Sequence, residues 1–448
     1  MNAKTGKNGD IELLRRERRE LFRRAVDFKK TCRVPNLANV GTWRVMDAGY
    51  KLSEAFHDYR VMERCVRRFL TLYPVDALLD LGTRNPFGVM EAFGAGYYSY
   101  DDESETISAN PIPLCEYTEL PAYLQNPEKF IWEVAMPRKF PSFREMNAGQ
   151  WEKAVKEQLR FNAYKERIAR VAREEYGLPD TSYGGFGSPS AGIEYLFSTL
   201  RGILGLSVDM RKDPGLIKAC CFLLDEKTMR PTIEAVQRGA DGPQDACFDV
   251  SLIMLAHTIM SPRQFEAFYW PILKELLDAA VGKNKSVRIM LEGSGSTFFE
   301  YFQDYPKGTL AVNVERDDIF AARKKLPNAA LIGGMKTSTL ALGTKEECID
   351  MARRLVDEMG EGYIFGTDKF GRDIFSRVLV GTQITLTVGL AAVAISLTIG
   401  VILGAVAGYK GGKWDTVIMR VMDMMLAIPS ILLAIAIMAA LGPGIEKA

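Results

Sequence analysis

Histidine is rare in this chain, and its scarcity limits the chemistry available. Only His57 and His257 occur among 448 residues, so a metal site built mainly from histidines is excluded. The seven cysteines form no C-x-x-C pair, and residues 1–12 lack the apolar core of a signal peptide. Neither sign of charge prevails, with 57 Lys and Arg against 56 Asp and Glu. We therefore expect a reducing, cytoplasmic setting for the soluble part and no nucleic-acid partner.

Charge is also missing from two long stretches near the C-terminus. Residues 384–408 and 424–445 contain no charged side chain, and each has the roughly 20 residues that a helix needs to cross a bilayer. A pair of buried core helices is the alternative, but two such runs in succession are rare in soluble domains. We predict two transmembrane helices joined by a loop at 409–423 and preceded by an amphipathic, interfacial linker at 367–383. The chain is expected at a membrane, with its soluble part in the cytoplasm.

The soluble part alternates short apolar runs with helical patterns. After an N-terminal helix within residues 1–30, residues 31–366 are predicted to form an α/β domain, a (β/α)8 TIM barrel of parallel strands. A doubly wound open sheet is the competing fold, but no G-x-G-x-x-G follows a strand. The predicted strands are 75–81, 286–291, 309–314, 329–333 and 362–366, and the helices between the later ones are 297–305, 317–325 and 344–359.

In such a barrel the chemistry lies at the carboxyl ends of the strands. Glu292 ends an apolar strand, where a carboxylate must be paired, metal-bound or raised in pKa, and it is the leading catalytic candidate. His257 is a second catalytic candidate, with a structural role as the alternative. Asp318 either positions substrate or caps the helix that begins beside it.

Four segments resemble the uroporphyrinogen-decarboxylase-like superfamily, in the branch associated with corrinoid methyl transfer. They are STLRGILGLSVDMRKDP at 198–214, MSPRQFEAFYWPILK at 260–274, LEGSGSTFFEYFQDYPKG at 291–308 and residues 315–347. The resemblance implies the barrel fold, methyl transfer, a corrinoid supplied by a partner protein and zinc held by His, Cys and Cys. Arg201 and Asp209 follow the family pattern as substrate-binding residues or as a pair with each other.

The chain departs from this family at important positions. Glu292 and Ser294 stand where the family has H-x-C, and Leu331 stands where a later Cys would fall. Glu292 is then the one candidate for a metal ligand, and the metal stays unknown. Residues 32–49 do not match the arginine-rich motif of true uroporphyrinogen decarboxylases, so porphyrinogen decarboxylation is not expected.

From Gly366 the sequence resembles a different family, the permease subunits of dipeptide and oligopeptide ABC transporters. The motifs are G-T-D-x-x-G-R-D at 366–373, A-G-Y-x-G-G at 407–412 and L-G-P-G at 441–444. Such permeases have six spans and a coupling loop that binds the ATPase, and this chain ends at Ala448 before that loop. We therefore expect contact with the lipid bilayer but not with a permease partner or an ATPase.

We interpret the chain as a fused or misassembled gene product, a chimera whose chemistry lies in the barrel. The alternatives are an ABC permease component for dipeptide or oligopeptide transport, and a membrane-tethered decarboxylase-like enzyme.

Overall fold

The computed structural model describes residues 8–94, 98–109, 112–180, 189–239, 246–359, 397, 400–401 and 403–426. The chain divides into two compact units, Met1–Gly360 and Glu361–Ala448. The first unit has an α/β fold, and its largest sheet has the strand order β5-β6-β7-β8.

All neighbouring strands of this sheet are parallel. The sheet consists of β5 (Val250–Met254), β6 (Val287–Leu291), β7 (Leu310–Val314) and β8 (Ala330–Gly333). The connections contain η4 (Ala256–Ile259), α14 (Pro262–Phe268), α15 (Trp270–Gly282), η5 (Ser296–Tyr301) and α16 (Ile319–Lys325). Parallel strands with helical crossovers are the arrangement that the alternating sequence pattern predicts. The expected helix at 297–305 is instead the short 3-10 helix η5.

Successive residues of these strands contact two different cores. Val250, Val287 and Leu310 pair across the sheet and pack on the outer helices. Ala311 and Ala330, from β7 and β8, pack in a separate inner cluster. Both faces are therefore covered, which is why apolar side chains occur on both faces of these strands.

The inner cluster joins the sheet to the N-terminal part of the chain. It contains Leu37 of β1 (Leu37–Ala38) and Ala77 of β2 (Ala77–Leu78), two short parallel strands that pair with each other. Phe22 of α1 (Asn8–Val26) lies in the same cluster and meets the Phe248 ring edge-on at 6.2 Å. Strands β1, β2, β7 and β8 thus share one interior covered by α1, as in a TIM barrel.

Some expected bounds differ from the structure. The predicted strand 75–81 shrinks to β2 because Asp80 bends the chain by accepting hydrogen bonds from the backbone of Gly82 (2.9 Å) and Thr83 (3.1 Å). The N-terminal helix ends at Val26, and Phe28 has a left-handed φ of 57° that stops it. The expected last strand, 362–366, and the linker, 367–383, lie outside the described residues.

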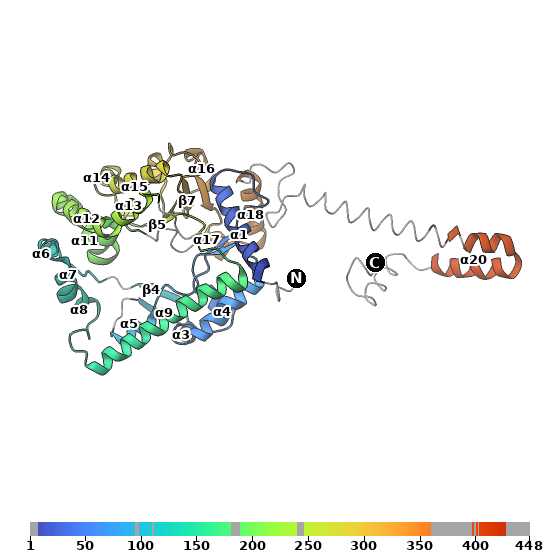
Figure 1. Ribbon diagram of the computed structural model, residues 1–448, viewed down its shortest axis with the longest axis horizontal. Helices are drawn as coiled ribbons and strands as arrows, with labels where there is room; N and C mark the ends of the chain where they lie inside the picture. The colour runs from blue at the N-terminus through green and yellow to red at the C-terminus, as the bar shows by residue number, and fades with distance from the viewer. Residues whose placement is uncertain are drawn as a thin grey trace. The chain divides into compact units, whose positions relative to one another are not determined.

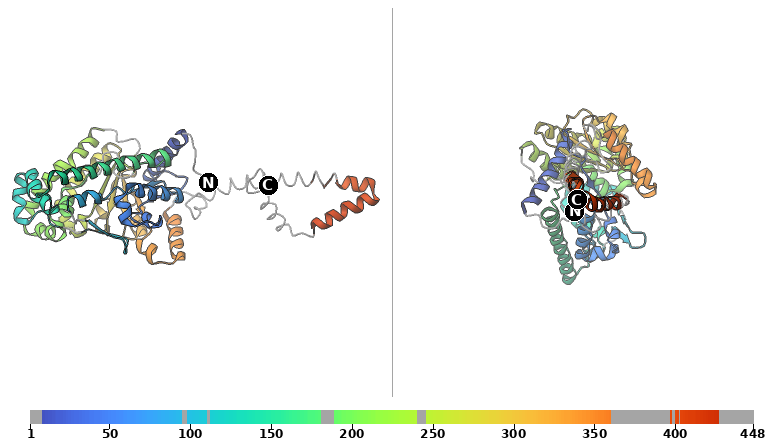
Figure 2. Two further views of the ribbon diagram at one scale, coloured as in Figure 1. Left: turned by 90° about the horizontal axis from the view of Figure 1, so that it is seen from below. Right: turned by 90° about the vertical axis from the view of Figure 1, so that its right-hand side faces the viewer.

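The remaining elements of this unit surround the strands. Figures 1 and 2 show the long helix α9 alongside α4, with which it shares the core around Val66 and Ile168. The elements not yet named are α2 (Trp43–Asp47), α3 (Leu52–His57), α4 (Tyr59–Leu72), α5 (Phe87–Ala92), β3 (Tyr98–Asp101), β4 (Thr106–Ala109), η1 (Tyr117–Glu119), α6 (Leu120–Gln125), α7 (Pro127–Phe130), η2 (Ile131–Ala135), α8 (Met136–Lys139), α9 (Ala148–Tyr176), α10 (Gly192–Tyr195), η3 (Leu196–Leu200), α11 (Gly202–Lys212), α12 (Pro214–Thr228), α13 (Arg230–Gln237), α17 (Thr337–Leu342) and α18 (Lys345–Met359).

In the second unit, α20 (Gly412–Leu426) occupies most of the stretch expected to be a loop, 409–423. That expectation is wrong, because residues 413–426 contain four helix-forming Met, and within the described range 403–426 the helical backbone is interrupted only near Gly411. Among the described residues, no helix combines the length and the apolar character needed to cross a membrane. The predicted spans at 384–408 and 424–445 fall mostly outside those residues.

The α1 contact can be tested by truncating its central side chain. Phe22→Ala should lower the free energy of unfolding by about 3–5 kcal/mol, because it leaves a cavity in the inner cluster. Leu13→Ala, on the same helix at a residue that is 56% exposed, should change it by less than about 0.5 kcal/mol. Urea unfolding of both variants measures the difference, and equal effects would show that α1 does not pack on the barrel.

Candidate functional site

The carboxyl ends of the parallel strands bring several polar residues to one edge of the sheet. Glu292 follows β6, Glu315 and Asp317 follow β7, and His257 lies in η4 after β5. Arg84, beyond β2, lowers the pKa of Glu292 through its charge, so the loops after β2 and β6 lie close together. We call this region the barrel mouth.

Glu292 is half-buried at the mouth. Its backbone N–H donates to the Met254 carbonyl at 3.2 Å, which fixes it beside the end of β5. Burial raises the pKa of its carboxyl, Arg84 lowers it, and Glu315 raises it. Among the described residues, none donates a hydrogen bond to the Glu292 carboxylate.

Glu194 of α10 is the buried carboxylate of the mouth, with an exposed fraction of 3%. Its Oε1 accepts hydrogen bonds from the backbone N–H groups of Leu255 (2.8 Å) and Ala256 (2.9 Å). Burial raises the pKa of Glu194 to about 7; these two donors and the Tyr269 hydroxyl oppose the rise, and the Glu292 charge adds to it.

His257 is 1% exposed and packs edge-on against Phe298 at 5.8 Å between ring centroids. Neither ring nitrogen has a hydrogen-bond partner of good geometry within the described part of the chain. Burial lowers the pKa of His257, while the backbone of Ser294 and the charge of Asp317 raise it. The ring therefore lies beneath the loop that follows Glu292. The structure leaves its catalytic role a prediction.

Two further carboxylates at the mouth accept hydrogen bonds from backbone N–H groups. Asp317 accepts hydrogen bonds from the Gly295 N–H (2.6 Å) and the Ser294 hydroxyl (2.6 Å), and Glu315 accepts one from the Gly293 N–H. Asp318 is exposed and accepts a hydrogen bond from the Ala321 N–H at 2.8 Å, so it caps α16. Of the two roles expected for Asp318, substrate positioning and helix capping, the structure shows capping.

Arg201 and Asp209 pair with each other. The Arg201 Nε donates to an Asp209 oxygen at 2.6 Å, and its Nη1 donates to the Cys115 carbonyl at 2.6 Å. Burial lowers the pKa of Arg201, but Asp209 and Glu116 raise it more, so the net shift is upward. Both side chains are buried, at 6% and 2% exposed. The pairing fixes η3 to the chain near Cys115, and a substrate-binding role stays a prediction.

The residues at the mouth do not fit the zinc site that the resemblance implies. Among the described residues, no group of three His, Cys, Asp or Glu side chains is placed to hold a metal ion. Leu331, at the position of the later Cys, packs with the helix-facing core. Ser294 instead donates its hydroxyl proton to Asp317. We therefore derive no step through zinc.

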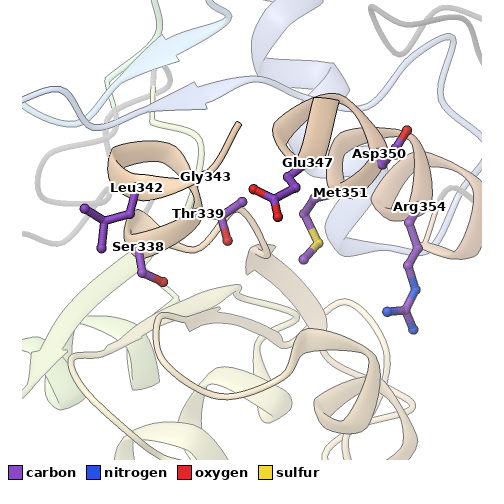
Figure 3. A pocket seen from close by; sticks show the side chains of 8 residues that line it. All are labelled: Ser338, Thr339, Leu342, Gly343, Glu347, Asp350, Met351 and Arg354. Carbon is purple, nitrogen blue, oxygen red and sulfur yellow. The ribbon is translucent and has the colours of Figure 1, made fainter. Parts of the chain in front are cut away.

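A pocket of about 580 Å³ lies between α17 and α18 (Figure 3). Its lining includes Glu347 and Arg354 but none of the mouth residues described above. Glu347 accepts a hydrogen bond from the Thr344 N–H at 2.7 Å, and Arg354 lies 3.9 Å over the Phe320 ring. Both groups already have structural roles, so the mouth is the stronger candidate site.

Sequence reasoning missed Glu194. The available signal was its isolation, since it is the one charged residue between Asp180 and Arg201. A single carboxylate within an uncharged stretch of this length must be buried with partners or altered in pKa. Its partners lie some 60 residues further along the chain, which is why no local pattern indicated them.

The fold and the mouth define a TIM-barrel-like α/β protein with carboxylates at the strand ends. The family model of uroporphyrinogen decarboxylase (URO-D) matches residues 134–368. The chain belongs to the URO-D family. A methyltransferase from Methanosarcina mazei is a structural neighbour, with a TM-score of 0.45 and 14% identity over 77% of this chain and 88% of that one.

A second set of relatives matches a shorter part of the chain. The probable D,D-dipeptide transport system permease protein DdpC of Escherichia coli is 50% identical over 100 residues, which are 22% of this chain and 33% of that protein. The dipeptide transport system permease protein DppC of Alkalihalophilus pseudofirmus is 55% identical over 84 residues, 19% of this chain and 28% of that protein. The chain thus spans about a third of these relatives. Both resemblances are confirmed, and the chain joins a URO-D domain to a permease-like segment.

The raised pKa of Glu194 makes stability depend on pH. The folded state keeps the proton up to about pH 7, whereas the unfolded chain releases it near 4.5, so stability should fall as the pH rises between these values. Gln cannot ionise, so the free energy of unfolding of Glu194→Gln should fall by about 3 kcal/mol less than that of the unaltered chain over this pH range. Urea unfolding between pH 4 and 8 measures it. An unchanged pH slope in the variant would contradict the burial of an ionisable Glu194.

Proposed function

We propose that the barrel transfers methyl groups in a corrinoid-linked system, with Glu292 as its acid–base residue. The observation that supports this is which carboxylates at the mouth accept hydrogen bonds. Glu194, Glu315 and Asp317 each accept hydrogen bonds from the backbone, whereas Glu292 accepts none from the described residues. Its carboxylate is the one left to act on a substrate. A partner protein would supply the corrinoid.

The expected role of Glu292 follows from proton balance. When a methyl group moves onto the sulfur or oxygen of a thiol or alcohol, the proton on that atom must leave. A carboxylate whose pKa is raised by burial accepts such a proton more readily than an exposed one. In the reverse direction the same group returns the proton. The charge of Arg84 opposes this rise in the pKa of Glu292.

Porphyrinogen decarboxylation is the weaker candidate for the barrel. A substrate with several carboxylates needs free arginines, and the segment 32–49 would have to supply them. Arg33 there forms an ion pair with Asp76, and Arg44, which is 1% exposed, bonds to Asp80. These arginines hold the fold together, which favours methyl transfer.

We further propose that the C-terminal segment tethers the enzyme to a lipid bilayer. The support is the identity of about half with peptide permeases and the two uncharged stretches at 384–408 and 424–445. Peptide transport is a second candidate, supported by the same identity, but the shared segment is about a third of those permeases.

The catalytic proposal predicts the effect of one substitution. Glu292→Gln in the full chain should lower the rate of methyl transfer from methylcobalamin to thiols at least about 100-fold, because the proton acceptor is lost. Glu315→Gln, at an exposed carboxylate of the same mouth, is the matched control and should keep the rate within about threefold. Equal rates for Glu292→Gln and the unaltered chain would reject the assignment.

The tethering proposal predicts where the protein is found after cell lysis. The full chain should sediment with membranes and need detergent for release, and removal of residues 370–448 should leave it in the supernatant. A carbonate wash separates integral from peripheral attachment. Recovery of the full chain in the supernatant would exclude the tether, and ATP-dependent peptide uptake in a permease-deficient host would favour transport instead.

A further inference from the structure

One peptide group at the end of β5 connects the two glutamates of the mouth. The Met254 carbonyl accepts the hydrogen bond from the Glu292 N–H (3.2 Å), and the Leu255 N–H of the same peptide group donates to Glu194 Oε1 (2.8 Å). The described residues contain no cis peptide bond, so this N–H and C=O point in opposite directions. The Glu194 side chain and the Glu292 backbone therefore lie at opposite edges of one peptide group.

This connection restricts the orientation of the peptide group strongly. A second hydrogen bond, from the Ala256 N–H to the same Glu194 oxygen (2.9 Å), fixes the next peptide as well. Hydrogen bonds in a chain polarise one another, so the bond from Leu255 N–H to Glu194 strengthens the bond from Glu292 N–H to the Met254 carbonyl. Glu194 thus holds in place the Met254 carbonyl, which accepts the hydrogen bond from the Glu292 N–H.

We propose that Glu194 is a positioning residue for Glu292, acting through the Met254–Leu255 peptide group. It sets the backbone from which Glu292 enters the mouth, because it fixes the peptide group whose carbonyl accepts the Glu292 N–H. The inference rests on the proposed role of Glu292 in catalysis.

The surroundings of Glu194 support a role beyond filling space. The hydroxyl of Tyr269, the residue before α15, also bonds to its carboxylate, and Asp225 of α12 accepts a hydrogen bond from the Gly192 N–H at 2.7 Å, which anchors the start of α10. Glu292 carries a charge that raises the pKa of Glu194. Loss of the Glu292 charge should therefore lower the Glu194 pKa.

Two substitutions separate the hydrogen bonds of Glu194 from its charge. Glu194→Gln keeps an oxygen that accepts the two N–H bonds but removes the charge, and Glu194→Ala removes both. The control is Asp249→Asn, because Asp249 binds the Ser286 N–H (2.8 Å) and fastens the opposite end of β5. Amide hydrogen exchange at Leu255 and Glu292 measures positioning. The carboxyl ¹³C shift of Glu194, assigned with Glu194→Gln, measures its titration in the unaltered chain and in the Glu292→Gln variant.

We expect Glu194→Ala to speed exchange at both amides about tenfold, and Glu194→Gln to change it less than about threefold. Glu292→Gln should move the Glu194 titration to lower pH, because it removes a charge that raises the Glu194 pKa, whereas Asp249→Asn should alter neither reading. If Glu194→Ala fails to fold, the Glu194 titration in the Glu292→Gln variant decides alone. The inference is overturned if that titration is unmoved, or if the two amides respond to Glu194→Ala no more than to Asp249→Asn. No substrate is needed, so absence of methyl transfer would reject the proposed function without affecting this result.

Discussion

The parallel pairing of β5 to β8 is the constraint on which the candidate site depends. Each strand hydrogen-bonds to the next in the same direction, so every carboxyl end emerges at one edge of the sheet. The apolar cores on both faces then hold the strands in register. Glu292, Glu315, Asp317 and η4 are brought together by this pairing alone, although they come from three separate connections. A sheet with mixed strand directions would distribute them over two edges.

Carboxylates at this edge have different roles because their hydrogen-bond donors differ. Backbone N–H groups satisfy Asp317 and Glu315, and they also reach the buried Glu194. Glu292 is left without a donor among the described residues, and burial raises its pKa. One residue type thus provides loop anchors, a buried acid and a free carboxylate within a small region. The roles of these carboxylates differ because the local backbone places N–H donors near some of them and not near others, and composition does not reveal this difference.

The main sheet could be predicted from the sequence, whereas much of the site could not. The strands expected at 286–291, 309–314 and 329–333 each agree with the structure except for their first residue, because buried parallel strands form continuous apolar runs. Strand β1 is two residues long and leaves no periodic signal, and β2 is a short part of the strand expected at 75–81. Glu292 was found because it directly follows an apolar run. Glu194 was missed because its donors come from a distant connection, and α20 was missed because a charged, apolar mixture between uncharged stretches was interpreted as a loop.

The packing of α1 into the inner cluster has a consequence for how the protein is made. Phe22 leaves the ribosome early, yet Phe248 and Ala311, which it contacts, are synthesised more than 200 residues later. At about 5–20 residues per second this interval lasts tens of seconds, during which the apolar face of α1 lacks its final partners. The barrel interior therefore closes late, and the nascent chain presents a binding surface for chaperones throughout that time.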